Sequence, residues 1–204
     1  MKVINNPPKK EWNVLLQRPT QTVNEIENTV TQIFEDVQRN KDIAISKYTQ
    51  LFDGVSLENT LVSSDEINTA AAEVSAVLKA SIQQAKSNIE AFHNAQKTDR
   101  VVVETSPGVT CWQEKRPIQK VGLYIPGGTA PLFSTVLMLA IPAQIAGCKE
   151  IVLCSPPNKE GKIHAAILYA AQLCGITKII KVGGIQAIAG MTFGTEIIPQ
   201  VSKI

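Results

Sequence analysis

The residues best suited to chemistry lie in two glycine-bearing loops in the second half of the chain. Tyr124 opens the segment YIPGGT, and Gln186 closes the segment GGIQ. Glycines let a backbone approach a ligand closely, and the start of a following helix offers free N–H groups to an anion such as a pyrophosphate. Tyr124 and Gln186 are the polar side chains best placed on these two loops to orient such a ligand.

Neither loop has the G-x-G-x-x-G spacing of a dinucleotide-binding turn. The strand predicted at residues 150–154 is followed by Ser155, Pro156 and Pro157, so no acidic residue is placed there to bind a ribose. A nucleotide or phosphate ligand and a role in tight packing are therefore equally good interpretations of the glycines. Under the first interpretation the candidate cofactor-binding residues are Tyr124, Pro126, Gly127, Gly128 and Gln186.

Cysteine and histidine give little support for metal or thiol chemistry. The four cysteines are far apart and lie in or beside apolar segments, so we expect all of them to be small buried hydrophobic residues: Cys111, Cys148, Cys154 and Cys174. The two histidines, His93 and His164, have no nearby cluster of ligands. We expect each of them to be a surface or helix-capping residue.

The elements that must position the two loops follow from the pattern after residue 100, where short apolar runs alternate with Gly and Pro. A pair of strands is predicted at 101–103 and 109–112, around the turn at 106–108. Strands then alternate with helices, the strands at 121–125, 150–154 and 178–182 and the helices at 131–146 and 162–174. This alternation predicts parallel pairing, half of a doubly wound α/β sheet in which ligands bind beyond the carboxyl ends of the strands.

The first hundred residues are typical of a helical scaffold. One apolar stripe is formed by Val23, Ile26, Val30, Ile33 and Val37. A shorter helix is expected at 43–52, and one long helix from a polar start at 63–66 to about Gln96. The fold class is therefore α/β, with a helical region at 1–100 followed by an incomplete Rossmann-like domain at 101–204.

Composition excludes several classes of function. With 44% hydrophobic residues, 19% charged residues and a net charge of +2, the chain should fold, and it gives no electrostatic case for nucleic acid. The segment between Lys120 and Lys149 carries no charge, but glycines and prolines at 126–131 interrupt it, so a membrane span is not expected. The residues at the start of the sequence lack the apolar stretch of a signal peptide, which predicts a cytoplasmic protein.

Longer motifs around the two loops resemble the histidinol dehydrogenase family. The resemblance is carried by residues 121–128 with 130–138, by 182–189, and by 193–196 with 198–199; in the helical half it is carried by 48–49, 52–54, 88–89 and 92–93. It covers essentially the whole chain, and the two loop motifs are specific.

This resemblance implies a zinc-dependent, NAD-linked oxidation of L-histidinol to L-histidine through the aldehyde, carried out by a homodimer. It implies that Tyr124 and Gln186 contact NAD. The family is about twice as long as this chain, and its zinc ligands and catalytic Glu–His pair come after the point that corresponds to Ile204. We therefore expect no catalytic residue and no metal ligand within 1–204, little activity from this part alone, and a tendency to dimerise or aggregate. The alternatives are a nucleotide- or phosphate-binding module without catalysis and a purely structural part.

Overall fold

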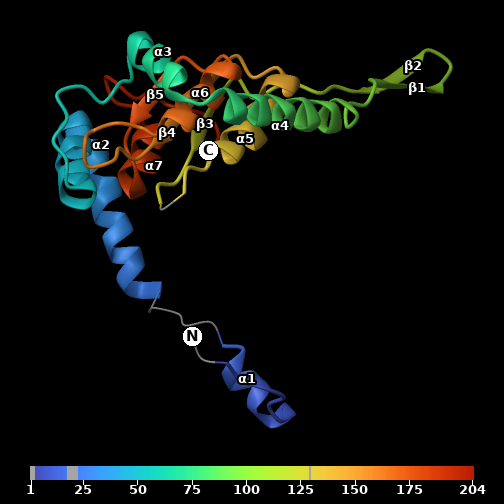
Figure 1. Cartoon of the computed structure of the whole chain (residues 1–204). Coiled ribbons are helices and arrows are strands. Elements are labelled where there is room, and N and C mark those ends of the chain that lie inside the picture. Colours follow the sequence, from blue (N-terminus) through green and yellow to red (C-terminus); the bar gives the residue numbers. More distant parts are fainter. Residues whose placement is uncertain (1–2, 18–22, 129) are drawn as a thin grey trace. The chain divides into compact units, whose positions relative to one another are not determined.

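The structure, a computed structural model, describes residues 3–17, 23–128 and 130–204. The chain divides into one compact unit up to Gln32 and a second unit, Ile33–Ile204, which contains the sheet. In chain order the elements of Figure 1 are the 3-10 helix η1 (Lys9–Glu11), α1 (Trp12–Leu15), α2 (Val23–Asp53), α3 (Ser64–Glu73), α4 (Ala76–Asn94), β1 (Val101–Ser106), β2 (Val109–Gln113), β3 (Lys120–Tyr124), α5 (Phe133–Ala146), β4 (Glu150–Ser155), α6 (Ala165–Leu173), β5 (Lys178–Lys181) and α7 (Gly184–Phe193).

A parallel three-stranded sheet in the order β3-β4-β5 forms the centre of the second unit. Tyr124 lies opposite Cys154 in the register, and Ser155 lies opposite Lys181. The carboxyl ends of the strands therefore lie side by side, and the loops that leave them share one end of the sheet. The predicted α/β fold class, with alternating strands and helices, is confirmed.

Helices cover both faces of this sheet (Figure 1). Because side chains alternate along a strand, Leu153 packs into a cluster with α5 and α6, whereas Val152 and Cys154 pack into a second cluster with α7 and the later part of α2. Outside the first layer, α3 packs against α6 and α4 against α5. Helices α3 and α4 thus support α6 and α5, the crossover helices that connect the parallel strands.

Short segments pair with both edges of the sheet. Val62 N donates to Ile179 O at 2.9 Å, so the segment before α3 lies along β5. On the other side, Gly122 N donates to Lys203 O at 2.8 Å, so the last residues lie along β3. Each edge therefore has backbone partners, which removes part of the template for edge-to-edge association.

The long helix predicted from residues 63–66 to about Gln96 is wrong, because the structure divides it into α3 and α4. Its start is confirmed, since the Ser63 side chain accepts a hydrogen bond from Glu66 N. At the break Val74 is extended, with φ −73° and ψ 127°, and Ser75 caps α4 by accepting from Leu78 N at 3.3 Å. The second cap was missed because the apolar seam continues across it.

Helix α2 combines the two helices predicted at its ends. Its dihedral angles depart from helical values at Lys41, where φ is 48° and ψ is −124°. Ile33 and Val37 are buried as the stripe predicts, whereas Ile26 is 49% exposed. The side chain of Val23 lies outside the described part of the chain.

The prediction that all four cysteines are buried is confirmed for Cys154 and Cys174 and wrong for Cys111, which is exposed; Cys148 is half-buried. Cys111 lies on the β1–β2 hairpin, where alternation in a two-stranded ribbon leaves both faces uncovered. Burial raises the pKa of Cys154 to about 12. This thiol is therefore a packing group, since thiols react as thiolates.

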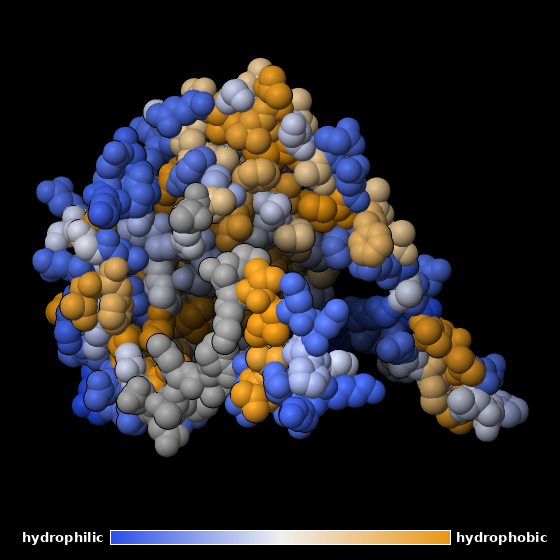
Figure 2. Space-filling model, turned by 60° about the horizontal axis from the view of Figure 1, so that its bottom comes forward, coloured by the Kyte–Doolittle hydropathy of each residue, from blue (hydrophilic) through white to orange (hydrophobic). Residues whose placement is uncertain are grey.

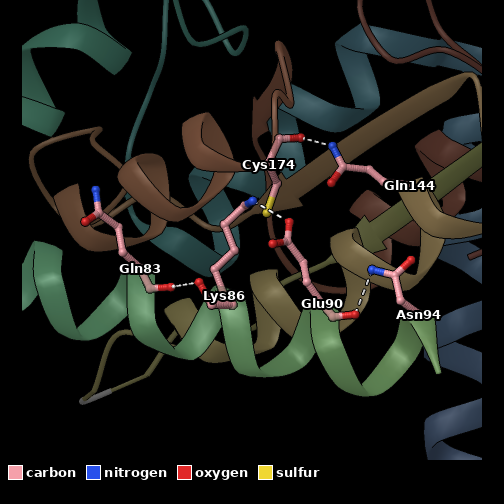
Figure 3. Close-up of polar contacts among 7 residues, drawn as sticks. Gln83, Lys86, Glu90, Asn94, Gln144 and Cys174 are labelled. Carbon is pink, nitrogen blue, oxygen red and sulfur yellow. Dashed lines mark hydrogen bonds and ion pairs between the residues drawn. The ribbon is translucent and has the colours of Figure 1, made fainter.

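Polar contacts surround the end of α6, and one of them fastens α5 to it (Figure 3). Lys86 pairs with Glu90 beside the Cys174 side chain, and Gln144 Nε2 donates to the Cys174 carbonyl. Burial raises the pKa of Cys174 to about 11. The thiol therefore stays neutral at physiological pH and contributes to packing.

The β1–β2 hairpin extends away from the rest of the second unit (Figure 1). Val102 lies opposite Trp112, and both side chains are more than half exposed. Val101 and Val103, on the other face of the ribbon, are also exposed, and apolar residues are visible on the projecting hairpin at the right of Figure 2. Its side chains are available for contacts that the described chain does not make.

The uncharged segment between Lys120 and Lys149 forms β3, a loop and α5, in agreement with the prediction. Val136, Leu137 and Ala140 of α5 are completely buried in the cluster against the sheet. Across residues 3–17, 23–128 and 130–204, no helix combines the length and hydropathy required to cross a bilayer.

Candidate nucleotide-binding site

The candidate residues lie at the end of the sheet where β3, β4 and β5 finish. Tyr124 is the last residue of β3, and its hydroxyl accepts a hydrogen bond from Gly184 N at 3.0 Å. Gly184 is the first residue of α7, so this bond uses one of the N–H groups that a helix leaves free at its start. This hydrogen bond joins the end of β3 to the loop that follows β5, the first and third of the predicted parallel strands.

Gln186 lies in the first turn of the same helix and is completely buried. Neither its Oε1 nor its Nε2 has a hydrogen-bond partner in the described chain. Gly184 has φ +62°, and a Cβ at this position would lie 2.8 Å from Gln186 Oε1. The glycine therefore provides both the backbone conformation and the space for the amide. An unpaired buried amide costs stability, which is typical of a group whose partner is a ligand or ordered water.

Pro126, Gly127 and Gly128 line a pocket of about 280 Å³ between the loops that follow β3 and β4. The second loop contributes Ser155 and Pro156 among others. The pocket is open to solvent and lies between the starts of α5 and α6. Its lining does not include Tyr124 or Gln186, so the five predicted residues form two neighbouring groups.

Pro156 connects these two groups. A Cβ on Gly127 would lie 2.6 Å from Pro156 Cγ, and a Cβ on Gly183 would lie 2.5 Å from Pro156 Cβ. Both distances are too short for any side chain. Of the two interpretations of the glycines, tight packing therefore holds at these two positions, and it brings the loops together around the pocket.

Among the pocket residues that were not predicted from the sequence are two basic ones. Lys162 and His164 line it, just before α6. His164 caps that helix, since its Nδ1 accepts from Ala166 N at 3.1 Å, and this confirms the expected capping role. The sequence offered one signal for a place in the site: both residues lie between the second predicted strand and the body of the helix that follows it. His93 is half-buried and contacts Gln96 Oε1 through Nδ1 at 2.8 Å, far along the chain from this site.

The described residues offer no donor set for zinc. Within the described ranges, no three side chains of His, Cys, Asp or Glu come together in a group that could hold a metal ion. A zinc site needs three or four such ligands. The described residues therefore do not fit zinc, and no step of the chemistry is assigned to a metal bound by them.

Comparisons with known proteins identify the family of this chain. The family model of histidinol dehydrogenase matches residues 16–204. Histidinol dehydrogenase of Bacteroides fragilis is 55% identical over 204 residues, which are all of this chain and 48% of the relative. That of Escherichia coli O6:H1 is 51% identical over 201 residues, 98% of this chain and 45% of the relative.

The crystal structure of histidinol dehydrogenase from Elizabethkingia anophelis superposes with a TM-score of 0.90 at 56% identity, covering 98% of this chain and 46% of that one. The chain thus spans about half the length of the curated relatives that it matches. From the match over residues 16–204 and the shared fold, the chain belongs to the histidinol dehydrogenase family.

Proposed function

We propose that this chain contributes the NAD-binding part of a histidinol dehydrogenase, which oxidises L-histidinol to L-histidine through the aldehyde. Family membership supports the activity, since the matching relatives carry this name. The observation that carries the assignment of NAD is Gln186, whose completely buried amide has no partner in the described chain.

In this proposal each residue has a definite task. The Gln186 amide, which can both donate and accept, would hydrogen-bond polar groups of the cofactor, and Tyr124 orients the start of α7 through Gly184. Pro126, Gly127 and Gly128 form one wall of the pocket for the remainder of the dinucleotide. Two NAD molecules, bound in turn, would supply the hydride acceptors, one for the alcohol and one for the hydrated aldehyde.

The catalytic groups and the zinc ligands are assigned outside residues 1–204. For the zinc ligands, the support is that no three His, Cys, Asp or Glu side chains come together among the described residues. We also propose that the working enzyme is a homodimer in the cytoplasm. The four free cysteines agree with that reducing compartment.

Calorimetric titration of the 204-residue chain with NAD tests the cofactor site. We expect saturable binding that Gln186→Ala weakens by about tenfold, since a buried amide that pairs with a ligand contributes about 1.4 kcal/mol. Tyr124→Phe should have a smaller effect of the same sign. As a matched control, Gln172→Ala removes an amide on α6 that bonds Asn68 and lies outside the site. Binding that neither site variant changes would rule out this assignment.

A turnover assay separates the enzyme from the binding module. The purified chain is mixed with L-histidinol, NAD and zinc, and NADH absorbance is followed. We expect NAD binding without turnover from this chain alone. Zinc-dependent turnover would mean that catalytic groups lie within residues 1–204. A fusion of this chain with the second half of a relative tests the binding-module alternative. The fusion should turn over L-histidinol if the chain is part of the enzyme, and it should not if the chain is only a binding module.

A further inference from the structure

The irregular turn of α2 contacts the end of α7, the helix that begins at the candidate site. Lys41 Nζ donates to the carbonyl of Gly194, the residue after α7, at 3.1 Å. Beside it, the Asp42 carboxylate accepts from the Thr195 hydroxyl at 2.7 Å and from Glu196 N at 2.9 Å. We propose that Asp42, together with Lys41, is a positioning residue that fixes α7 and thereby the groups at its start. The consequence for NAD rests on the proposed function, whereas the effect on α7 does not.

The backbone at Lys41 has a conformation that a lysine rarely adopts. Its φ of 48° with ψ of −124° is open mainly to glycine, so the side chain strains the chain at this point. Such strain persists only where the surrounding contacts hold it in place. Here the turn directs two neighbouring side chains, Lys41 and Asp42, to one target, the end of α7. The strained turn therefore indicates a role for this contact.

Lys41 and Asp42 satisfy polar groups that the end of a helix leaves unpaired. The last carbonyl groups of a helix lack partners and carry partial negative charge. Helix α7 has no basic residue in its own last turn, so the Lys41 ammonium supplies the compensating charge from another helix. Beyond the helix, Thr195 Oγ1 donates to Asp42 and accepts from Ile198 N at 2.9 Å. The turn after α7 is thus built around the Asp42 carboxylate.

Helix α7 can transmit its position from one end to the other because it is short and closely packed. Its ten residues span about 15 Å, and a hydrogen-bonded helix of this length moves as a rigid element. A Cβ on Gly190 would lie 3.2 Å from Ile45 Cδ1, so α7 lies directly against α2 (Figure 1). At its start, Gly184 N donates to the Tyr124 hydroxyl, and Gln186 is completely buried. A shift at the end of α7 would therefore displace both groups at its start.

Amide hydrogen exchange, followed by NMR, tests the positioning without any ligand. In the 204-residue chain, Asp42→Ala should speed exchange of the Gly184 amide at least about tenfold, because its bond to Tyr124 opens more often. The internal reference is the Ile125 amide, which donates to Cys154 O at 2.9 Å at the centre of the sheet and should change much less. Equal factors at the two amides would mean that Asp42 only stabilises the fold. That result, or an unchanged Gly184 amide, would overturn the inference.

Three milder variants keep the test decisive if Asp42→Ala does not fold. Asp42→Asn keeps the shape of the side chain but replaces one acceptor oxygen with a donor. Thr195→Val removes only the hydroxyl partner, and Lys41→Met removes only the ammonium. Each should speed exchange of the Gly184 amide relative to the Ile125 amide, by about threefold or more. If none of the three does so, the inference is wrong.

The matched control is Glu150→Gln. Like Asp42, Glu150 is a carboxylate with two partners, since it pairs with Lys120 at 3.3 Å and with Lys178 at 3.0 Å. These three residues lie where the parallel strands begin, at the opposite end of the sheet from the candidate site. Glu150→Gln should therefore leave the Gly184 amide unchanged relative to the sheet. A selective effect as large as that of Asp42→Ala would contradict the assigned role.

Calorimetric titration with NAD connects the positioning to the proposed function. Asp42→Ala should weaken NAD binding at least about fivefold, and Glu150→Gln should leave it unchanged. If the chain binds NAD and Asp42→Ala leaves its affinity unchanged, the positioning inference is wrong while the NAD site stands. If the Gly184 amide responds selectively but the chain does not bind NAD, the positioning of α7 stands and the NAD-binding function is wrong.

Discussion

Pro156 occupies the space that a side chain on either glycine loop would need. On Gly127 an added methyl group would lie 2.6 Å from Pro156 Cγ, and the backbone there needs no unusual dihedral angle. Gly127→Ala should therefore act by overpacking alone. We expect it to lower the free energy of unfolding by about 1–3 kcal/mol, as measured by urea denaturation.

The second half of this test is Pro156→Ala. It removes Cγ and Cδ of the ring, so that the nearest remaining atom, Cβ, would lie 3.7 Å from the new methyl group, at ordinary contact distance. The double variant should recover most of the loss caused by Gly127→Ala, with a coupling energy of at least about 1 kcal/mol. Simple addition of the two single losses would show that the clash is not the cause.

Among the helices, α2 is held in shape across its irregular residue by Asp36. This carboxylate accepts from Lys47 Nζ at 2.6 Å, Asn40 Nδ2 at 2.7 Å and the Tyr48 hydroxyl at 2.9 Å. These bonds, chiefly the one from Lys47, lower the pKa of Asp36 from 3.8 to about 2. The carboxylate thus connects the segments before and after Lys41.

The lowered pKa predicts how stability depends on pH. Because the folded-state pKa lies below the unfolded-state value, the contribution of Asp36 is complete above about pH 5 and is lost as the pH falls from about 4 to 2. In urea denaturation over this range, Asp36→Asn should be less stable than the unsubstituted chain at pH 6 and should lose less stability on acidification. Asp99→Asn, at an exposed position without a hydrogen bond in the described chain, should keep the original slope.

Ser75 determines where α4 begins. Its hydroxyl accepts from Leu78 N, one of the N–H groups that the helix cannot satisfy itself. Ser75→Ala should lower the free energy of unfolding by about 1 kcal/mol. Ser81→Ala in the same helix is the control, because the Ser81 hydroxyl only bonds back to Val77 O and its loss should be close to neutral. Equal losses in thermal unfolding would contradict a capping role.

The break between α3 and α4 also shows which elements the sequence can predict and which it cannot. The parallel sheet follows from the regular alternation of apolar strands and helices, and the cap at Ser63 follows from local chemistry. The cap at Ser75 is hidden because Val74 and Leu78 continue the apolar seam across it. The bond from Gly184 N to Tyr124 joins residues 60 positions apart, and only strand order brings them together. Lys162 was missed for the same reason, since its place in the pocket depends on the neighbouring loop.

At the scale of the whole molecule, the apolar surface is unevenly distributed. Both edges of the parallel sheet have backbone partners, whereas both faces of the β1–β2 hairpin are exposed. A two-stranded hairpin on its own is marginally stable in water and gains from a covering surface. The chain spans about half the length of its relatives, and we expect a second copy in the proposed homodimer to supply such a surface.

The hairpin is therefore expected to drive self-association of the isolated chain. Val101 and Val103 point to the same face of β1 and are 52% and 50% exposed, so Val101→Lys with Val103→Lys places two charges on one apolar face. In sedimentation equilibrium the unsubstituted chain should associate in a concentration-dependent manner, and this double variant should weaken association at least tenfold. Val77→Lys, on α4 at 80% exposure, adds a charge elsewhere and should leave association unchanged. A specific apolar contact must respond to charge placed within it and not to charge placed on a helix elsewhere. The hairpin is therefore not the associating surface if the unsubstituted chain is monomeric at high concentration, or if both variants have the same effect on association.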